Sequence, residues 1–506
     1  MSAVGTRDAG LTAARRWGVL VTIGAGLLLI TLDNSILYTA LPTLTEELGA
    51  SGAQSLWIIN AYPLVMAGLL LGSGTLGDRV GHRRMFLIGL VVFGVASLVA
   101  AFAPSAGLLI AARALLAVGA AAMMPATLAL IRVTFLVERE RNLAIAVWGS
   151  LSVVGMALGP IAGGALLKAF WWGSVFLVNV PVVIVAVVAV LSLAPRDQPD
   201  PGKTWDLLSS VQVMAGLVGA VFTIKELGHR PPNPAVVAVA AITSIIGFRL
   251  FVRRQQRLAH PLIDFAIFRN PAFTAGVLAA GLSMFAVGGL QLVTTQRFQL
   301  VEGFTPLAAG LLVAAAALGS LPTALLGGAF LHRTGLRPMI AGGLALATGG
   351  VVLVAVGLSA GFALLVFGLV VTGAGLGSVM AVASTAIVGN VPARRAGMAS
   401  SVEEVSYELG SVIAVAMLGS LVTFVYATTV RLPAGAPAAA RESLPDAHAS
   451  GAGNPAILEA ANAAYDTGYL VTMAVIAVVL AAGAAVTARL LRHHGPASVS
   501  ALRPGH

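Results

Sequence analysis

The sequence contains no cysteine, and only 10% of its 506 residues are charged. Without cysteine the chain has neither disulfide bonds nor thiolate metal ligands. Aromatic residues make up 6% of the chain and hydrophobic residues 58%, a composition that excludes a water-soluble globular domain. The apolar runs are about 20 residues long and do not alternate with polar residues, as the strands of a membrane β-barrel would. The sequence therefore predicts an all-α integral membrane protein.

Signs of catalysis are also missing. The eight histidines are scattered without metal-ligand spacing, and no GxxxxGK[ST] phosphate-binding loop occurs. We therefore expect no enzyme activity, no metal and no bound cofactor. The net charge of +10 reflects membrane orientation rather than nucleic-acid binding.

Fourteen apolar runs predict fourteen transmembrane helices. They lie at about Trp17–Thr39, Leu56–Leu76, Met85–Phe102, Leu108–Ile131, Leu143–Leu167, Val175–Leu193, Leu207–Ile224, Ala235–Phe251, Ala272–Thr295, Leu307–Leu331, Met339–Leu358, Phe362–Val388, Ala399–Val425 and Ala464–Leu490.

Two charged turns of similar sequence indicate that the chain is duplicated. GTLGDRVGHRRMFLIGL starts at Gly74, and GAFLHRTGLRPMIAGGL starts 254 residues later, at Gly328. The two segments match at several positions, including Gly81 with Gly335, whereas Asp78 is replaced by His332. A repeated unit of helix, turn and helix predicts two six-helix pseudo-repeats, with the seventh and eighth helices inserted between them.

This duplication divides the chain into five parts. We expect a cytoplasmic N-terminus at 1–16, a six-helix bundle at 17–194, a linker with two extra helices at 195–270, a second six-helix bundle at 271–491 and a cytoplasmic tail at 492–506. Residues 428–463 are rich in Ala and Pro, which predicts an external, poorly ordered loop.

The positions of Lys and Arg predict the orientation. With both termini in the cytoplasm, 23 of the 30 Lys and Arg residues lie on the inner side, 6 lie outside and Arg113 lies within a helix. Positive residues collect on the cytoplasmic side of membrane proteins. We therefore expect a multi-pass protein of the cytoplasmic membrane with both ends inside.

Ionisable residues inside predicted helices are the candidate functional residues, because each costs about 2.5–3.5 kcal/mol at the bilayer centre. Asp33 and Arg113 lie at similar distances from the outer ends of their helices and are expected to meet. One interpretation is a simple ion pair that locks two helices. The other is a carboxylate that takes up and releases protons, with the nearby arginine setting its proton affinity.

Three further acids lie within SSVEEVSYELGSV. Glu404 and Glu408 are four residues apart and share a helix face, whereas Glu403 points about 100° away. Tyr407 adds a polar aromatic group. The alternative is that Glu403 and Glu404 lie near the cytoplasmic mouth and are only solvated.

Small residues follow one face of the fifth predicted helix. In GMALGPIAGG, Gly155, Gly159 and Gly163 are spaced by four, with Pro160 and Gly164 beside them. Such a stripe permits close helix packing, and the proline favours a bend.

Together these motifs resemble the major facilitator superfamily and its fourteen-helix drug:proton antiporter family. GTLGDRVGHRRMFL is similar to the loop signature between the second and third helices, with Gly74, Asp78, Arg79, Gly81 and Arg83 in place. Arg113 with Gly119, GMALGPIAGG and LDNSILYTALP resemble the signatures of the fourth, fifth and first helices. VEEVSYELG is similar to a segment of exporters of quaternary ammonium compounds, in which the acid matching Glu404 is implicated in substrate or proton binding.

The resemblance implies a proton-coupled multidrug exporter that works by alternating access, driven by the proton gradient. Three positions depart from it: Asn60 and Ser320 stand where some relatives carry an acid, and His332 replaces the acid of the second turn. With fewer cavity acids, we expect lipophilic monocations and neutral drugs rather than dications as substrates. The expected partners are drugs, protons and lipid, and the expected state is a monomer.

Two alternatives to a broad exporter remain open at this point. One is a dedicated exporter of one natural product, which confers antibiotic self-resistance, and the other is a non-transporting membrane protein. A non-transporting membrane protein that kept the fold would not need its intramembrane acids, and a membrane enzyme has no catalytic group to support it.

Overall fold

The computed structural model describes residues 12–197, 199, 205–228, 232–258, 261–391, 396–450 and 454–493. Within them, fourteen helices are long and apolar enough to cross a membrane, which confirms the predicted number. The helices are α1 (Ala13–Glu47), α2 (Gly52–Val80), α3 (His82–Ala101), α4 (Ala106–Thr134), α5 (Glu138–Ala169), α6 (Ser174–Leu177), α7 (Asn179–Leu193), α8 (Leu207–Gly228), α9 (Pro234–Gln255), α10 (Pro271–Leu300), α11 (Pro306–Thr334), α12 (Gly343–Ala360), α13 (Phe362–Val388), α14 (Ala396–Thr429), α15 (Leu444–Ser450) and α16 (Pro455–Leu490).

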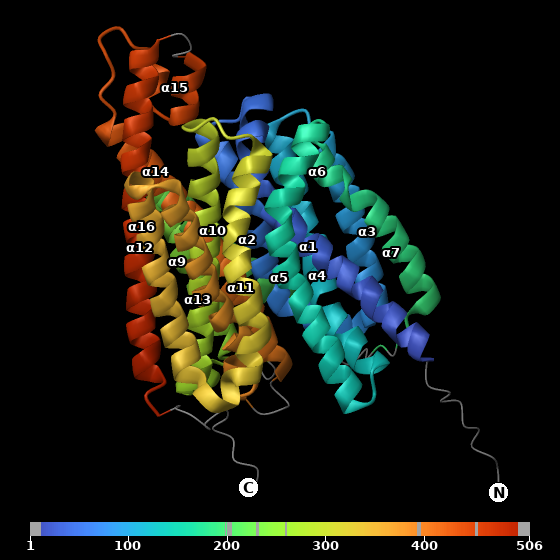
Figure 1. Ribbon diagram of the computed structural model, residues 1–506. Helices are drawn as coiled ribbons and strands as arrows, with labels where there is room; N and C mark the ends of the chain where they lie inside the picture. Colours follow the sequence, from blue (N-terminus) through green and yellow to red (C-terminus); the bar gives the residue numbers. More distant parts are fainter. Residues whose placement is uncertain are drawn as a thin grey trace, which may run out of the picture.

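The helices form two groups that meet at one end of the molecule (Figure 1). The helices from α1 to α7 form the N-terminal half, and those from α10 to α16 form the C-terminal half. The halves contact each other through α1 with α10, α2 with α14 and α5 with α11. They diverge toward the end at which α1 begins and α16 ends (Figure 1). The structure is therefore closed at the opposite end.

Several helix ends differ from the predicted ones. The first helix was expected to end at Thr39, but α1 continues through Pro42 to Glu47. Leu41 and Leu44 are fully buried, so their packing outweighs the helix-breaking tendency of the proline. The sixth span, Ser174–Leu193, consists of the short α6 followed by α7.

The loop before the last helix is more ordered than the sequence predicts. Its described part carries a 3₁₀ turn, Ala438–Arg441, and the helix α15. The Tyr426 hydroxyl donates to the carbonyl of Ala440 at 2.7 Å, and Leu444 is buried. The expectation of a poorly ordered loop is wrong for residues 428–450, because apolar side chains within the Ala-rich stretch pack on the adjoining ends of α14 and α16.

The two related turns end their preceding helices in the same way. Gly81 has φ +104° and Gly335 has φ +81°. Their N–H groups donate to the carbonyls of Gly77 and Leu331, four residues back. A positive φ is open to glycine but disfavoured for other residues, which explains why glycine stands at both positions of the repeat.

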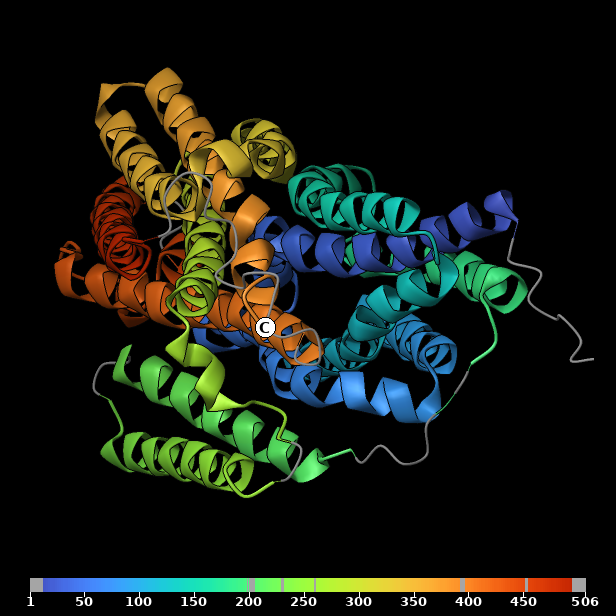
Figure 2. The ribbon, with the colours of Figure 1, turned by 90° about the horizontal axis from the view of Figure 1, so that it is seen from below.

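The inserted helices α8 and α9 form a hairpin beside the bundle, with α9 outermost (Figure 2). The hairpin leans on one helix of each half, because α8 contacts both α2 and α14. Near one end of α8, the buried Lys225 ammonium donates to the carbonyl of Ala53 at 2.5 Å and lies over the ring of Trp57.

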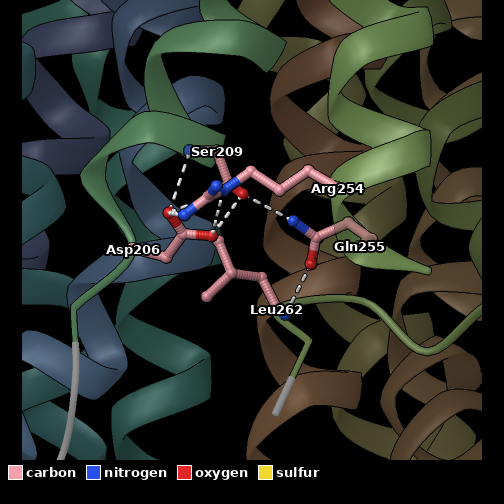
Figure 3. Close-up of polar contacts among 5 residues, drawn as sticks. All are labelled: Asp206, Ser209, Arg254, Gln255 and Leu262. Carbon is pink, nitrogen blue, oxygen red and sulfur yellow. Dashed lines mark hydrogen bonds and ion pairs between the residues drawn. The ribbon is translucent and has the colours of Figure 1, made fainter. Parts of the chain in front are cut away.

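A polar network fixes the other end of this hairpin (Figure 3). The Arg254 guanidinium donates to both carboxylate oxygens of Asp206, and Ser209 donates to the same carboxylate. Burial raises the pKa of Asp206, but these hydrogen bonds outweigh it, so the pKa lies below its usual range. Gln255 donates to Ser209 and accepts from the N–H of Leu262 at 2.7 Å. The hairpin is thereby bonded to the segment that leads into α10.

Candidate functional site

Asp33 of α1 and Arg113 of α4 meet inside the N-terminal half, as the sequence predicts. The Asp33 carboxylate accepts a short hydrogen bond from Nη1 of Arg113, and both side chains are at most 1% exposed. Since α1 runs on to Glu47, Asp33 lies nearer to the middle of its helix than expected. A fully buried ion pair between two helices is the central feature of this half.

Two further helices support this ion pair. Asn179, at the start of α7, donates from Nδ2 to the second oxygen of Asp33 at 2.9 Å. Arg113 donates from Nε to the carbonyl of Ile58 on α2, and its guanidinium lies 4.6 Å from the ring centroid of Tyr62. Residues from α1, α2, α4 and α7 therefore form a single buried group.

The C-terminal half brings Glu408 of α14 toward the same group. Glu408 lies three residues before Ser411 on α14, and its Oε2 is buried without a hydrogen-bond partner among the described residues. The hydroxyl groups of Tyr38 on α1 and Ser411 on α14 are 3.1 Å apart. The site is therefore built from both halves of the molecule, which is where a transporter that rocks one half against the other needs its coupling groups.

The other acids of α14 lie in different surroundings. Glu403 is buried and hydrogen-bonded with the side chains of Ser384 and Tyr407. The alternative that Glu403 is only solvated is therefore wrong. Glu404 is partly buried, and Glu408 lies one turn further along the same helix.

Several buried polar atoms around this site have no hydrogen-bond partner among the described residues. They are Asn34 Oδ1, both amide atoms of Asn60, the Tyr62 hydroxyl, Arg113 Nη2, Asn179 Oδ1 and Glu408 Oε2. Buried polar atoms are costly unless they are paired, so a polar or charged ligand would gain most by binding at these atoms. Asn60 is fully buried on α2, two residues from Ile58 and from Tyr62, and its assignment to the cavity stays a prediction.

Ser320 lies on α11, and its assignment to the cavity stays a prediction. Its hydroxyl donates to the carbonyl of Ala317 within α11. Its backbone packs against Gly377 of α13. Among the described residues, no hydrogen bond joins it to the group around Arg113.

The small residues of α5 pack as predicted, and on two neighbours. Added Cβ atoms at Gly155, Gly159 and Gly163 would meet Thr31, Ser35 and Ile36 of α1. The Ser35 hydroxyl donates to the carbonyl of Gly155 at 3.2 Å. On the other side, Gly164 touches Pro306 and Leu307, while Pro160 touches Gly310. Helix α5 therefore seals against α1 within its own half and against α11 of the other half.

The charged turn between α2 and α3 is held by an acid that the sequence analysis missed. Asp197, just after α7, accepts from the backbone N–H groups of Arg83 and Arg84 at 2.7 and 3.0 Å. The Arg83 guanidinium in turn donates to the carbonyls of Val190 and Leu191 on α7. Asp78 pairs with His82 in its own turn at 3.1 Å.

The remaining residues of this turn differ in their surroundings. A Cβ added at Gly81 would lie 2.6 Å from the Cβ of Asp197, whereas one at Gly74 would meet nothing within 4 Å. Arg79 is exposed. Of these two glycines, only Gly81 is closely approached by another part of the chain.

Four further residues contribute to these contacts, but no sequence signal identifies them: Asn179, Tyr38, Ser411 and Asp197. The first three are neutral residues within apolar helices, and Asp197 resembles any loop acid. Only the packing of distant helices shows their roles.

Comparison with known proteins identifies the family. Residues 23–415 match the family model of the Major Facilitator Superfamily. The chain is 39% identical over 493 residues to the multidrug efflux pump LfrA of Mycolicibacterium smegmatis, covering 95% of this chain and 97% of that protein. It is 35% identical to the methyl viologen resistance protein SmvA of Salmonella typhimurium, over 83% of this chain and 85% of the relative.

A solved structure has the same fold. A bacterial homologue of the human lysosomal transporter Spinster, crystallised in an inward-facing and unoccupied conformation, superposes with a TM-score of 0.66 at 17% identity, over 96% of this chain and 99% of the other. The chain belongs to the major facilitator superfamily and to its fourteen-helix drug:proton antiporter group.

Proposed function

We propose that this protein exports lipophilic and monocationic drugs in exchange for protons. The observation that carries the proposal is the buried Asp33–Arg113 pair of one half, beside the contact of α1 with the Glu408-bearing helix α14 of the other half, where the hydroxyls of Tyr38 and Ser411 are 3.1 Å apart. Carboxylates in such a site bind a proton or a cation but not both at once, because each neutralises the same charge. Competition for one site on a two-state protein gives antiport. The relatives named for multidrug efflux support the same class of substrate.

In this proposal both termini lie in the cytoplasm, and the structure represents the conformation open to the inside. Drug enters between the diverging ends of the two halves, and protons enter after the opposite end opens. Inward proton movement is favoured by about 2.3 kcal/mol per 100 mV of membrane potential and about 1.4 kcal/mol per pH unit.

The test uses the purified chain in liposomes loaded with a pH-sensitive dye. An imposed proton gradient should drive ethidium against its concentration gradient, and adding ethidium should release protons from the vesicles. Ethidium movement that is unaffected by collapse of the gradient would contradict proton coupling. No movement of any drug in a broad panel would favour a protein that kept the fold without transport.

The same liposomes distinguish the breadth of specificity. A broad exporter should carry several chemically unrelated drugs, whereas a dedicated exporter should carry one. Methyl viologen, a dication, is the sharpest member of the panel, because the Salmonella relative is named for resistance to it. With Asn60 and Ser320 in place of acids, we expect this chain to export it more weakly than ethidium.

A further inference from the structure

The outer face of α9 is apolar along most of the helix and basic at its C-terminal end. Large apolar residues are exposed on it, including Val239, Ile242 and Ile246 at 66, 55 and 51%. Only 17% of the most apolar stretch of this helix is buried, the lowest share among the fourteen spans of the described chain. A helix so little covered by protein faces the lipid chains.

Three arginines continue the same face at the end of the helix. From Ile242 and Ile246 a spacing of three to four residues leads to Arg249 and Arg253 within α9, about 6 Å apart along the helix. Arg257 follows four residues later, two residues past the end of α9, and all three arginines are exposed. We call these three residues the arginine face of α9. Because it continues the lipid-facing stripe, it lies at the level of the lipid headgroups.

The fourth arginine of this segment is turned away from that face. Arg254 is held by Asp206 through three hydrogen bonds of 2.9 to 3.1 Å (Figure 3). Gln255, beside it, is buried against Ser209. This network fixes the rotation of the helix end. By contrast, no carboxylate among the described residues pairs with Arg249, Arg253 or Arg257.

We propose that the arginine face of α9 binds the phosphate headgroup of an anionic membrane phospholipid. Guanidinium groups form paired hydrogen bonds with phosphate oxygens, and the apolar residues above them contact the acyl chains of the same lipid. The face lies on the side of the membrane that holds both termini, because α9 is the eighth of fourteen spans.

Lipid bound here contacts the hairpin that joins the two halves. Helix α8 leans on α2 and α14, which carry Tyr62 and Glu408, and the end of α9 is bonded to the segment before α10. The hairpin is thus the element through which the lipid acts on the packing of both halves. This inference does not rest on the proposed transport activity.

Binding is measured on the full-length chain in detergent, without drug, with fluorescent phosphatidylglycerol and the matching phosphatidylcholine as probes. The wild type should bind phosphatidylglycerol more tightly. One arginine near a charged membrane surface contributes about 1 kcal/mol, or about fivefold in affinity. We expect Arg249→Gln/Arg253→Gln to weaken binding of phosphatidylglycerol by about tenfold or more and to leave that of phosphatidylcholine unchanged.

The matched control is Arg489→Gln/Arg492→Gln, which removes two exposed arginines from the same side of the membrane, at the end of α16. This control should retain the preference for phosphatidylglycerol. Equal loss in both variants would mean that net charge alone acts and would overturn the proposal, as would the absence of any preference in the wild type.

A second arm separates lipid from free anion. Inorganic phosphate at millimolar concentration should not displace the fluorescent lipid, because the site also holds acyl chains; displacement would identify a soluble-anion site and contradict a lipid site. Thermal unfolding in phosphatidylcholine micelles checks folding. If the double variant is unstable, the single variants Arg249→Gln and Arg257→Gln replace it, each with an expected loss of about fivefold.

Discussion

At the scale of single residues, Asp33 and Arg113 combine two roles that mutation can separate. Removing one member of a buried pair leaves an uncompensated charge and costs about 3–5 kcal/mol, whereas removing both is often nearly neutral. Asp33→Asn should therefore lower both the unfolding temperature and drug-driven proton release. Asp33→Asn/Arg113→Gln should recover the unfolding temperature but not the proton release, measured in dye-loaded liposomes.

The double variant decides between the two interpretations of the pair. If it exchanges drug for protons at the wild-type rate, Asp33 only locks α1 to α4, and the coupling carboxylate lies elsewhere. Asn179→Leu is a useful companion, since it removes the hydrogen bond to the other carboxylate oxygen of Asp33 without changing any charge.

Glu404 provides the second prediction at this scale. A partly buried carboxylate attracts a lipophilic cation strongly in surroundings of low dielectric constant. Glu404→Gln should reduce ethidium efflux by about tenfold, the effect of about 1.4 kcal/mol, and should affect a neutral drug less. Efflux of both substrates is measured in cells that express equal amounts of each variant. The two rates are then compared with those of the wild type.

Glu403→Gln is the control for this prediction. Glu403 is hydrogen-bonded with two hydroxyl groups, which can rotate to suit an amide, so a milder effect is expected. Equal loss of ethidium and neutral drug in Glu404→Gln would indicate a structural or general coupling role. No loss of either would place Glu404 outside the drug path.

Residue types alone predicted the charged members of the site, but not their partners. An acid or arginine within an apolar run is conspicuous because of its cost in the membrane, so Asp33, Arg113 and the three glutamates were identified from the sequence. Asn179 and Ser411 are neutral and carry little cost, so nothing in the sequence distinguishes them from ordinary helix residues. Their roles depend on long-range contacts: Asn179 bonds to Asp33, 146 positions away, and Ser411 contacts Tyr38, 373 positions away.

At the scale of elements, hydrogen bonds to α7 and to Asp197 just after it hold the turn between α2 and α3 in place. The Asp197 carboxylate caps the first N–H groups of α3, where the helix dipole also favours a negative charge. Asp197→Ala should destabilise the protein by about 1–2 kcal/mol and slow transport, and Asp78→Asn should have a smaller effect. Thermal unfolding and liposome transport are compared for the two variants, with ethidium binding measured by fluorescence.

Substitution of Gly81, which faces Asp197, tests the same contact between the turn and the segment after α7. A leucine would require a disfavoured positive φ and would collide with Asp197. Gly81→Leu should therefore abolish transport while drug binding persists, and Gly81→Ala should be intermediate. Normal transport with lost drug binding would show that the turn belongs to the drug site instead. The sequence predicted the glycine from its repeat, but the acid that it faces became visible only when α7 was placed beside it.

At the scale of the whole molecule, the sequence was sufficient for the helix number and the duplicated organisation. Membrane spans are marked by long apolar runs, and the repeat is marked by matching turns, so both are local signals. The way the halves touch was not predictable, because it depends on which small or polar residues of distant helices come together. Gly164 with Leu307 and Tyr38 with Ser411 are examples.

The contact of α1 with α10 shows how a proline takes part in this closure. Pro42 has no N–H, so the carbonyl of Tyr38, four residues earlier, lacks its helical partner. The Thr295 hydroxyl of α10 lies 3.0 Å from that carbonyl. Gln299 donates to the next carbonyl, that of Thr39, at 3.0 Å. These bonds cross between the halves at the closed end.

The Thr295 hydroxyl also has an acceptor in its own helix, the carbonyl of Gln291 at 2.5 Å. When the halves separate, the hydroxyl can turn to that acceptor, and water that enters the opening can satisfy the Tyr38 carbonyl. No donor is then left buried and unpaired, which would otherwise cost about 1–3 kcal/mol. The bond between Thr295 and Tyr38 is therefore suited to form and break during transport.

Thr295→Val should shift the protein toward the conformation open at this end. Loss of one hydrogen bond of about 1 kcal/mol changes a two-state equilibrium about fivefold. Pro42→Ala should act in the same direction, because the new N–H competes for the Tyr38 carbonyl, and Thr295→Ser should behave as wild type.

Since the chain has no cysteine, spin labels on Glu47→Cys and Glu459→Cys report the separation of the halves directly. A longer-distance population that grows in Thr295→Val and Pro42→Ala is expected, and distributions identical to wild type in both would show that the bond does not hold this end closed.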